Sequence, residues 1–129
     1  MFKKVVLISL LCVLTACVTV EPERPLQIAG TVHFDPKLTL PHTSEAVIAL
    51  VDLDNPGRVF ETKQLKIYQQ PLLFQFYVNK DLLSSEVNYG VVALIRTQEE
   101  ILLQSYHRYP VINNEKHVVD IYLEPYVPL

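Results

Sequence analysis

The chain has 129 residues, half of them hydrophobic, and 11 basic and 14 acidic side chains give it a formal net charge of −3. This length fits one domain with a substantial core. The acidic balance argues against nucleic acid as a partner and against a polybasic membrane contact, because both depend on clustered basic side chains that meet phosphates.

The first segment has the pattern of an export signal. Lys3 and Lys4 precede an apolar run, residues 5–14, that has the length of a secretory hydrophobic region. A membrane-anchor helix is the alternative, but the uncharged stretch at residues 5–20 is 16 residues long, whereas an apolar helix needs roughly 20 residues to cross a bilayer. The segment therefore predicts a signal peptide.

The apolar run ends on the sequence LTAC at residues 14–17, which resembles the bacterial lipobox. The resemblance implies that residues 1–16 are a lipoprotein signal peptide and that Cys17 receives a covalent diacylglycerol and an N-acyl chain. Each buried methylene contributes about 0.8 kcal/mol, so two or three acyl chains anchor a protein durably to a lipid bilayer. An ordinary thiol near a cleavage site is the alternative.

The residue after the cysteine bears on which membrane the protein reaches. An aspartate at this position commonly retains such lipoproteins at the inner membrane, and this chain has Val18 instead. We therefore expect a lipid anchor in the outer membrane and a domain on its periplasmic face. Cys12 leaves with the signal peptide and Cys17 carries lipid, so we expect no disulfide in the domain.

A short tether is predicted between the anchor and one folded domain. Residues 17–25 contain the lipidated cysteine, two prolines and three charges without periodicity, which is typical of a semi-extended linker. Residues 26–129 then form the domain. Seven segments in it have strand patterns, and only residues 79–87 could hold a turn of helix. The predicted strands are residues 26–34, 45–53, 58–67, 72–78, 88–96, 101–108 and 117–123.

The spacing of these segments predicts an all-β fold, an antiparallel β-sandwich or barrel of about seven short strands. The sequence DNPG at residues 54–57 predicts a hairpin turn, and Pro71 precedes the fourth strand. In that strand, LLFQFYV, strict alternation places Phe74 and Phe76 together on the predicted core face.

The sequence contains no motif for catalysis, for a cofactor or for a metal. The acidic residues near Asp54 suggest a calcium loop, but its twelfth position would be Lys63 and Pro56 interrupts it. No serine lies in a nucleophile elbow, and no glycine run could cradle a phosphate. We therefore predict no enzyme and no metal site. The histidines, which are too scattered for a metal site, are His33, His42, His107 and His117.

Tyrosines are concentrated in the last quarter of the chain. Tyrosine and arginine are favoured at protein interfaces, where a dry centre has a hydrogen-bonded rim. The alternative is that these rings only close the open end of the sandwich. The predicted partner-contact residues are Tyr106, Arg108, Tyr109, Tyr122 and Tyr126.

With its strand segments in this order behind a lipobox, the chain resembles the family of small envelope lipoproteins that contains the type III secretion lipoprotein chaperone (pilotin) YscW and the more widespread lipoprotein YbaY. The resemblance implies a periplasmic β-sandwich tethered by lipid and without known catalysis, which in some members escorts a secretin to the outer membrane. It offers no catalytic residue. The matching segments are residues 28–34, 40–54, 71–78, 89–95, 102–112 and 118–125.

We therefore predict a non-enzymatic, outer-membrane-anchored lipoprotein that acts by protein contact. A pilotin-like chaperone with a secretin partner is the first hypothesis. A housekeeping envelope lipoprotein, structural or stress-related and without a secretin partner, is the second. A small glycan-binding or lipid-binding module is the third, and a tyrosine-lined open cavity would favour it.

Overall fold

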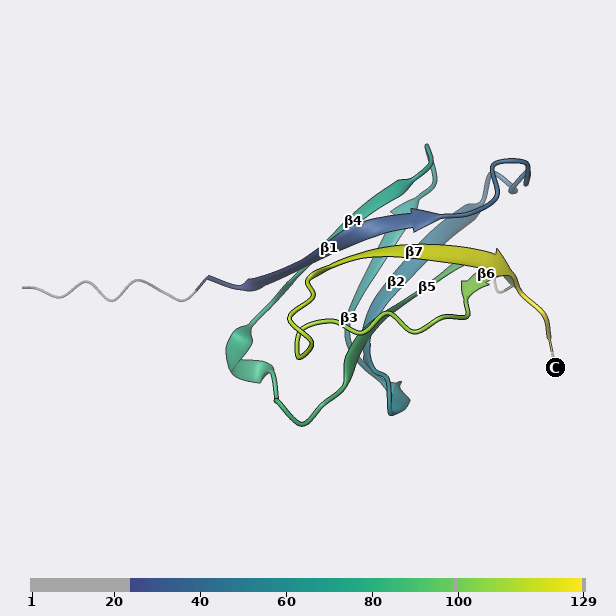
Figure 1. Cartoon of the computed structure of the whole chain (residues 1–129). Coiled ribbons are helices and arrows are strands. Elements are labelled where there is room, and N and C mark those ends of the chain that lie inside the picture. Colours follow the sequence, from purple (N-terminus) through teal and green to yellow (C-terminus); the bar gives the residue numbers. More distant parts are fainter. Residues whose placement is uncertain (1–23, 99, 129) are drawn as a thin grey trace, which may run out of the picture.

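The computed structural model describes residues 24–98 and 100–128 (Figure 1). The predicted signal peptide, the lipidation site Cys17 and most of the predicted tether lie outside these residues. One short 3-10 helix, η2 (Lys80–Leu82), interrupts the strands. The strands are β1 (Leu26–His33), β2 (Ser44–Asp52), β3 (Asn55–Lys66), β4 (Leu72–Val78), β5 (Tyr89–Thr97), β6 (Glu100–Ser105) and β7 (Val118–Pro125).

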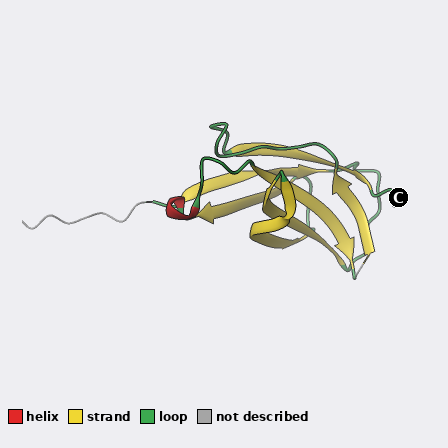
Figure 2. Cartoon of the chain, turned by 90° about the horizontal axis from the view of Figure 1, so that it is seen from below, coloured by secondary structure: helices red, strands yellow, loops and turns green. Residues whose placement is uncertain are grey.

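All seven strands belong to one sheet in the order β3-β2-β5-β6-β7-β1-β4. The sheet curls until its two edge strands, β3 and β4, approach each other, so that it forms a nearly closed barrel (Figures 1 and 2). The predicted all-β fold of about seven strands is thus confirmed. One pair departs from the antiparallel pattern, because β1 runs parallel to β7.

The core lies inside this curled sheet and follows the alternation of the strands. In β4, Leu72, Phe74 and Phe76 are buried while the residues between them are exposed. The rings of Phe74 and Phe76 lie 5.7 Å apart, so the predicted core face of this strand is confirmed. Burial of such large apolar side chains is the main favourable contribution to folding.

Gly30 allows the close approach of β1 to its neighbours. A Cβ atom at this position would lie 2.0 Å from the Val119 carbonyl oxygen on β7 and 2.9 Å from the Phe74 ring on β4. Any larger residue would therefore push the backbones apart. The close packing of β1 against β7 and β4 thus depends on a residue without a side chain at this point.

The predicted boundaries differ from the structure most at the start of β3 and at the end of β6. The turn that joins β2 to β3 lies at residues 53 and 54, so the last three residues of the predicted DNPG turn already belong to β3, which begins at Asn55 instead of residue 58. The predicted turn of helix is η2, whose first turn is capped by the Asn79 side chain. β6, however, ends at Ser105 instead of continuing to residue 108. The chain then leaves the β6–β7 pair and runs beside β5, where the Val91 amide donates to the Tyr109 carbonyl oxygen at 3.0 Å.

Candidate functional site

Tyr106 fastens the C-terminal segment to the end of β6. Its hydroxyl donates to the Pro125 carbonyl oxygen at 3.2 Å and accepts from the Val127 amide at 2.9 Å. The Tyr126 amide donates to the Leu102 carbonyl oxygen at 3.0 Å, so the segment after β7 continues beside β6. The structure therefore brings Tyr106 close to the segment that contains Tyr126, but it uses the Tyr106 hydroxyl within the domain.

Tyr109 and Tyr122 meet where the segment after β6 passes β7. The Tyr109 hydroxyl accepts from the Tyr122 amide at 3.0 Å, and its ring packs against the core. Tyr122 points outward, is 56% exposed, and stacks on His33 with ring centroids 4.7 Å apart. Tyr109 is thus a structural contact, whereas Tyr122 presents its ring at the surface.

Arg108 and Tyr126 complete the predicted contact residues. Both side chains are exposed. Arg108 takes part in none of the hydrogen bonds and ion pairs that the structure shows between described residues. Of the five predicted residues, Arg108, Tyr122 and Tyr126 therefore present side chains that a partner could reach without breaking an internal side-chain hydrogen bond.

A polar chain joins β1 to β7 on the outer face beside Tyr122. The Thr31 hydroxyl donates to Asp120 Oδ1 at 2.6 Å, and His33 Nε2 lies 2.7 Å from the same hydroxyl oxygen. Because the single hydroxyl proton points at the carboxylate, His33 must donate to Thr31. His33 is therefore not placed as a base that could activate this hydroxyl.

On the outside of β4, β1 and β7, exposed apolar side chains that were not predicted as a surface lie among polar ones, and we call these apolar side chains the apolar outer face. Leu73 is 68% exposed and Val118 is 69% exposed, and both lie beside β1 residues in the register. Tyr77 and Tyr122 extend the face along β4 and β7. The signal was present in LLFQFYV, whose outward positions include Leu73 and Tyr77 beside the polar Gln75, but its meaning depended on the strand order.

The barrel remains open at a seam between the edge strands β3 and β4. Across it, Lys63 Nζ on β3 donates to the Gln75 carbonyl oxygen on β4 at 3.2 Å. Two shallow grooves flank this bond, one of about 280 Å³ that reaches Leu73 and one of about 250 Å³ that reaches Tyr77. We call this region the β3–β4 seam.

A pocket of about 460 Å³ lies at the end of the barrel where β1 finishes, opposite the end where the chain enters at Leu26. The Ser44 hydroxyl, a buried group at this pocket, has no hydrogen-bond partner within the described part of the chain. The pocket contains Tyr68 but none of the tyrosines that were predicted to contact a partner. Its lining residues include Phe34, Leu38, Leu40, His42, Ser44 and Ile67.

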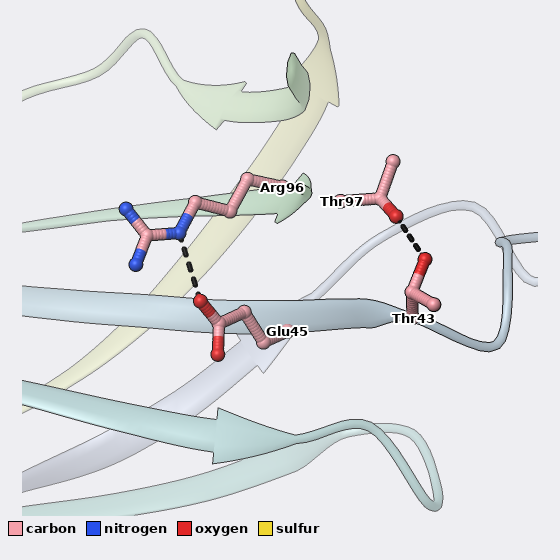
Figure 3. A network of polar contacts seen from close by, with 4 residues as sticks. All are labelled: Thr43, Glu45, Arg96 and Thr97. Atoms are coloured by element: carbon pink, nitrogen blue, oxygen red, sulfur yellow. Dashed lines mark hydrogen bonds and ion pairs between the residues drawn. The ribbon is translucent and has the colours of Figure 1, made fainter. Parts of the chain in front are cut away.

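Polar contacts elsewhere in the barrel are structural. Arg96 on β5 pairs with Glu45 on β2 at 2.9 Å, and Thr97 is bonded to Thr43 beside them (Figure 3). Both side chains of the ion pair are more than one-third exposed, and such surface pairs contribute at most about 1 kcal/mol. These contacts fix the register between β2 and β5 and form no site of their own.

Residues 24–98 and 100–128 contain no group of three or more His, Cys, Asp or Glu side chains that could hold a metal ion. In the same residues, no helix is long and apolar enough to cross a bilayer. What the described surface offers is apolar area, an incompletely closed sheet and a few exposed aromatic and basic side chains. Such features suit contact with another macromolecule.

The comparisons with known proteins agree with this description. A family model described as "Type III secretion system lipoprotein chaperone (YscW)" matches residues 23–123. A solved structure described as "Structure of an alternative pilotin from the type II secretion system of Vibrio cholerae" is similar, with a TM-score of 0.70 and 21% identity over 79% of this chain and 97% of that one. At this identity the likeness shows a shared fold. A search of curated proteins gives no match.

Proposed function

Because the chain belongs to the type III secretion system lipoprotein chaperone (YscW) family, which is non-enzymatic, we propose that it is a pilotin that binds a secretin and escorts it to the outer membrane. The observation that carries the proposal is the family match, which spans nearly the whole barrel from the end of the tether into β7. The fold likeness to a type II secretion pilotin supports the same assignment.

The proposed mechanism divides the work between the anchor and the barrel. Acyl chains on Cys17 would hold the protein to the bilayer, and the proline-containing tether would reach on the order of 25 Å at about 3.1 Å per extended residue. A secretin subunit bound to the barrel would therefore stay next to the membrane. Position 18 is a valine and not the aspartate that would retain the protein at the inner membrane, which supports outer-membrane sorting of the complex.

The five residues predicted from the sequence remain a proposed contact surface. We expect Tyr106→Ala combined with Arg108→Ala to weaken secretin capture, because truncation of interface tyrosine and arginine side chains costs about 2 kcal/mol or more, roughly thirtyfold in affinity. Since the Tyr106 hydroxyl fastens the C-terminal segment, Arg108→Ala alone must be measured beside the double variant. A thermal melt of both variants separates lost contact from lost folding. Wild-type capture by a normally folded double variant would remove these two residues from the interface.

The proposed function is tested by capture from the envelope. The full-length, tagged chain is purified from detergent-solubilised envelopes, and the eluate is probed for secretins, with Cys17→Ser as the unanchored control. We expect a secretin to co-purify with the wild-type chain. Wild-type eluates that contain no secretin, from cells that express one, would contradict a pilotin and favour a housekeeping envelope lipoprotein.

A further inference from the structure

The free edge of β4 lacks the features that usually protect an edge strand. Soluble proteins place charges, prolines, bulges or covering segments on such edges, because an open row of amides and carbonyls pairs readily with another strand. β4 is LLFQFYV, without a charged side chain or a proline. Its outward residues Leu73 and Tyr77 are 68% and 55% exposed. A strand of this composition would promote aggregation unless something covers it.

The direction of the backbone groups on β4 follows from two observations. Gln75 is in register with Ala29 on β1, and its carbonyl oxygen accepts from Lys63 on the opposite side. In an antiparallel pair, the amide and carbonyl of one residue point to the same side and alternate along the strand. Leu73, Gln75 and Tyr77 therefore direct their amides and carbonyls into the seam, and among the described residues no backbone ladder joins β4 to β3.

Lys63 occupies the seam from the inside. Its register partner on β2 is Ile48, which is fully buried, so the Lys63 side chain starts on the core-facing side of the sheet. An inward-pointing charge on an edge strand prevents uncontrolled pairing. Lys63 also lines both grooves of the seam, and its bond to the Gln75 carbonyl is the one side-chain hydrogen bond seen between β3 and β4 in the described residues.

The charged residues of β3 indicate which kind of group could replace the Gln75 carbonyl as the partner of Lys63. This strand carries Arg58, Lys63 and Lys66 against the single acid Glu61, although the whole chain has a net charge of −3. Of these charged residues, Lys63 and Glu61 line the grooves of the seam, and the Lys63 ammonium is the one that reaches across to the β4 backbone, where it bonds a neutral carbonyl oxygen. Charge complementarity of this kind selects a partner segment that carries carboxylates and disfavours basic segments.

We propose that the secretin partner adds an extended, acidic segment to the free edge of β4, and this inference rests on the proposed function. The segment would bond to the backbone of Leu73, Gln75 and Tyr77, and one of its carboxylates would take the Lys63 ammonium from the Gln75 carbonyl. Strand addition of this type draws affinity from main-chain hydrogen bonds and specificity from side-chain grooves. β3 would move outward by about one strand spacing, roughly 4.8 Å, and the added strand would close the barrel.

The first test compares two outward-facing residues of nearly equal exposure. Leu73→Glu places a negative charge at the free edge, where it repels an acidic segment, whereas Val118→Glu places the same charge on β7, away from the edge. Binding is measured with the full-length chain in detergent against the purified secretin. We expect Leu73→Glu to weaken binding about tenfold or more and Val118→Glu to change it less than about twofold. Equal losses in both variants would assign the contact to the apolar outer face and overturn edge addition.

The second test concerns the charge in the seam. Lys63→Arg keeps the positive charge, and Lys63→Glu reverses it opposite an acidic segment. We expect near-wild-type secretin binding for Lys63→Arg and a loss of about tenfold or more for Lys63→Glu. Unchanged binding by Lys63→Glu would overturn the acidic character of the segment.

A third measurement does not depend on whether a variant folds. Hydrogen exchange of the wild-type chain is followed with and without the secretin, and we expect new protection at the amides of Leu73, Gln75 and Tyr77. Secretin binding without protection there would overturn the inference and leave the proposed function intact, whereas failure of the wild-type chain to bind any secretin would overturn both. Self-association of the wild-type chain that Leu73→Glu abolishes would assign the edge to a second copy instead.

Discussion

The hydroxyl groups of two tyrosines bind the C-terminal part of the chain to the segment that follows β6. Tyr106 and Tyr109 are bonded to backbone groups of the C-terminal segment and of β7, so the tyrosine-rich composition that suggested an interface has at least partly a structural cause. From the sequence, a tyrosine whose hydroxyl bonds a backbone group cannot be told from a tyrosine whose ring is free at the surface. Only the path of residues 106–112 across the barrel distinguishes them.

The Tyr106 contact can be tested alone. Tyr106→Phe keeps the ring and removes the two hydrogen bonds to Pro125 and Val127. Since one such bond contributes about 0.5–1.5 kcal/mol, we expect a loss of about 1–2 kcal/mol in the free energy of unfolding. Tyr122→Phe is the control, because the Tyr122 hydroxyl forms none of the hydrogen bonds between described residues. Identical denaturant midpoints for the two variants would show that the C-terminal segment is not fastened by Tyr106.

At the level of elements, the periodicity of the sequence predicted which face of a strand is buried, but it did not predict which strands pair with each other. The alternation in β4 and β7 identified their buried faces correctly, because burial on one face imposes a period of two on the sequence. The parallel pairing of β1 with β7 has no local signal, since it depends on which strands become neighbours. For the same reason Leu73 and Tyr77 were recognisable as apolar, but not as residues of an open edge.

The core face of β4 should dominate stability. Phe74→Ala and Phe76→Ala each remove a buried ring, and such changes cost about 3–5 kcal/mol. We expect both variants to lose most of their cooperative thermal transition. Tyr77→Ala is the control on the same strand, because Tyr77 is 55% exposed and should melt close to the wild type. An unchanged melt for both phenylalanine variants would contradict the observed orientation of the strand.

The contact between β1 and β7 should depend on Gly30. Gly30→Ala places a methyl group 2.0 Å from the Val119 carbonyl oxygen, and overpacking typically costs about 1–3 kcal/mol or more. Gly57→Ala is the control, because an added methyl group there would lie 3.9 Å from the Asn55 side chain, an ordinary van der Waals contact. We expect a lower melting temperature for Gly30→Ala alone. Equal melting temperatures for the two variants would show that β1 and β7 can separate without loss.

For the whole molecule, the proposal requires a lipid anchor at one end and a binding barrel at the other. Cys17 is the residue that the lipobox pattern offers for lipidation. We expect Cys17→Ser to lose incorporation of a labelled fatty acid and to leave the membrane fraction or remain unprocessed. Wild-type labelling of Cys17→Ser would contradict the lipoprotein assignment.

The central claim, that the barrel escorts a secretin, is tested most directly by the location of the secretin itself. Envelopes from cells with and without this protein are separated on a density gradient, and the secretin is detected in each fraction. We predict that the secretin and this protein share the outer-membrane fractions in wild-type cells, and that the secretin shifts to the inner-membrane fractions when the protein is deleted. A secretin that remains in the outer-membrane fractions of the deleted cells would contradict a pilotin.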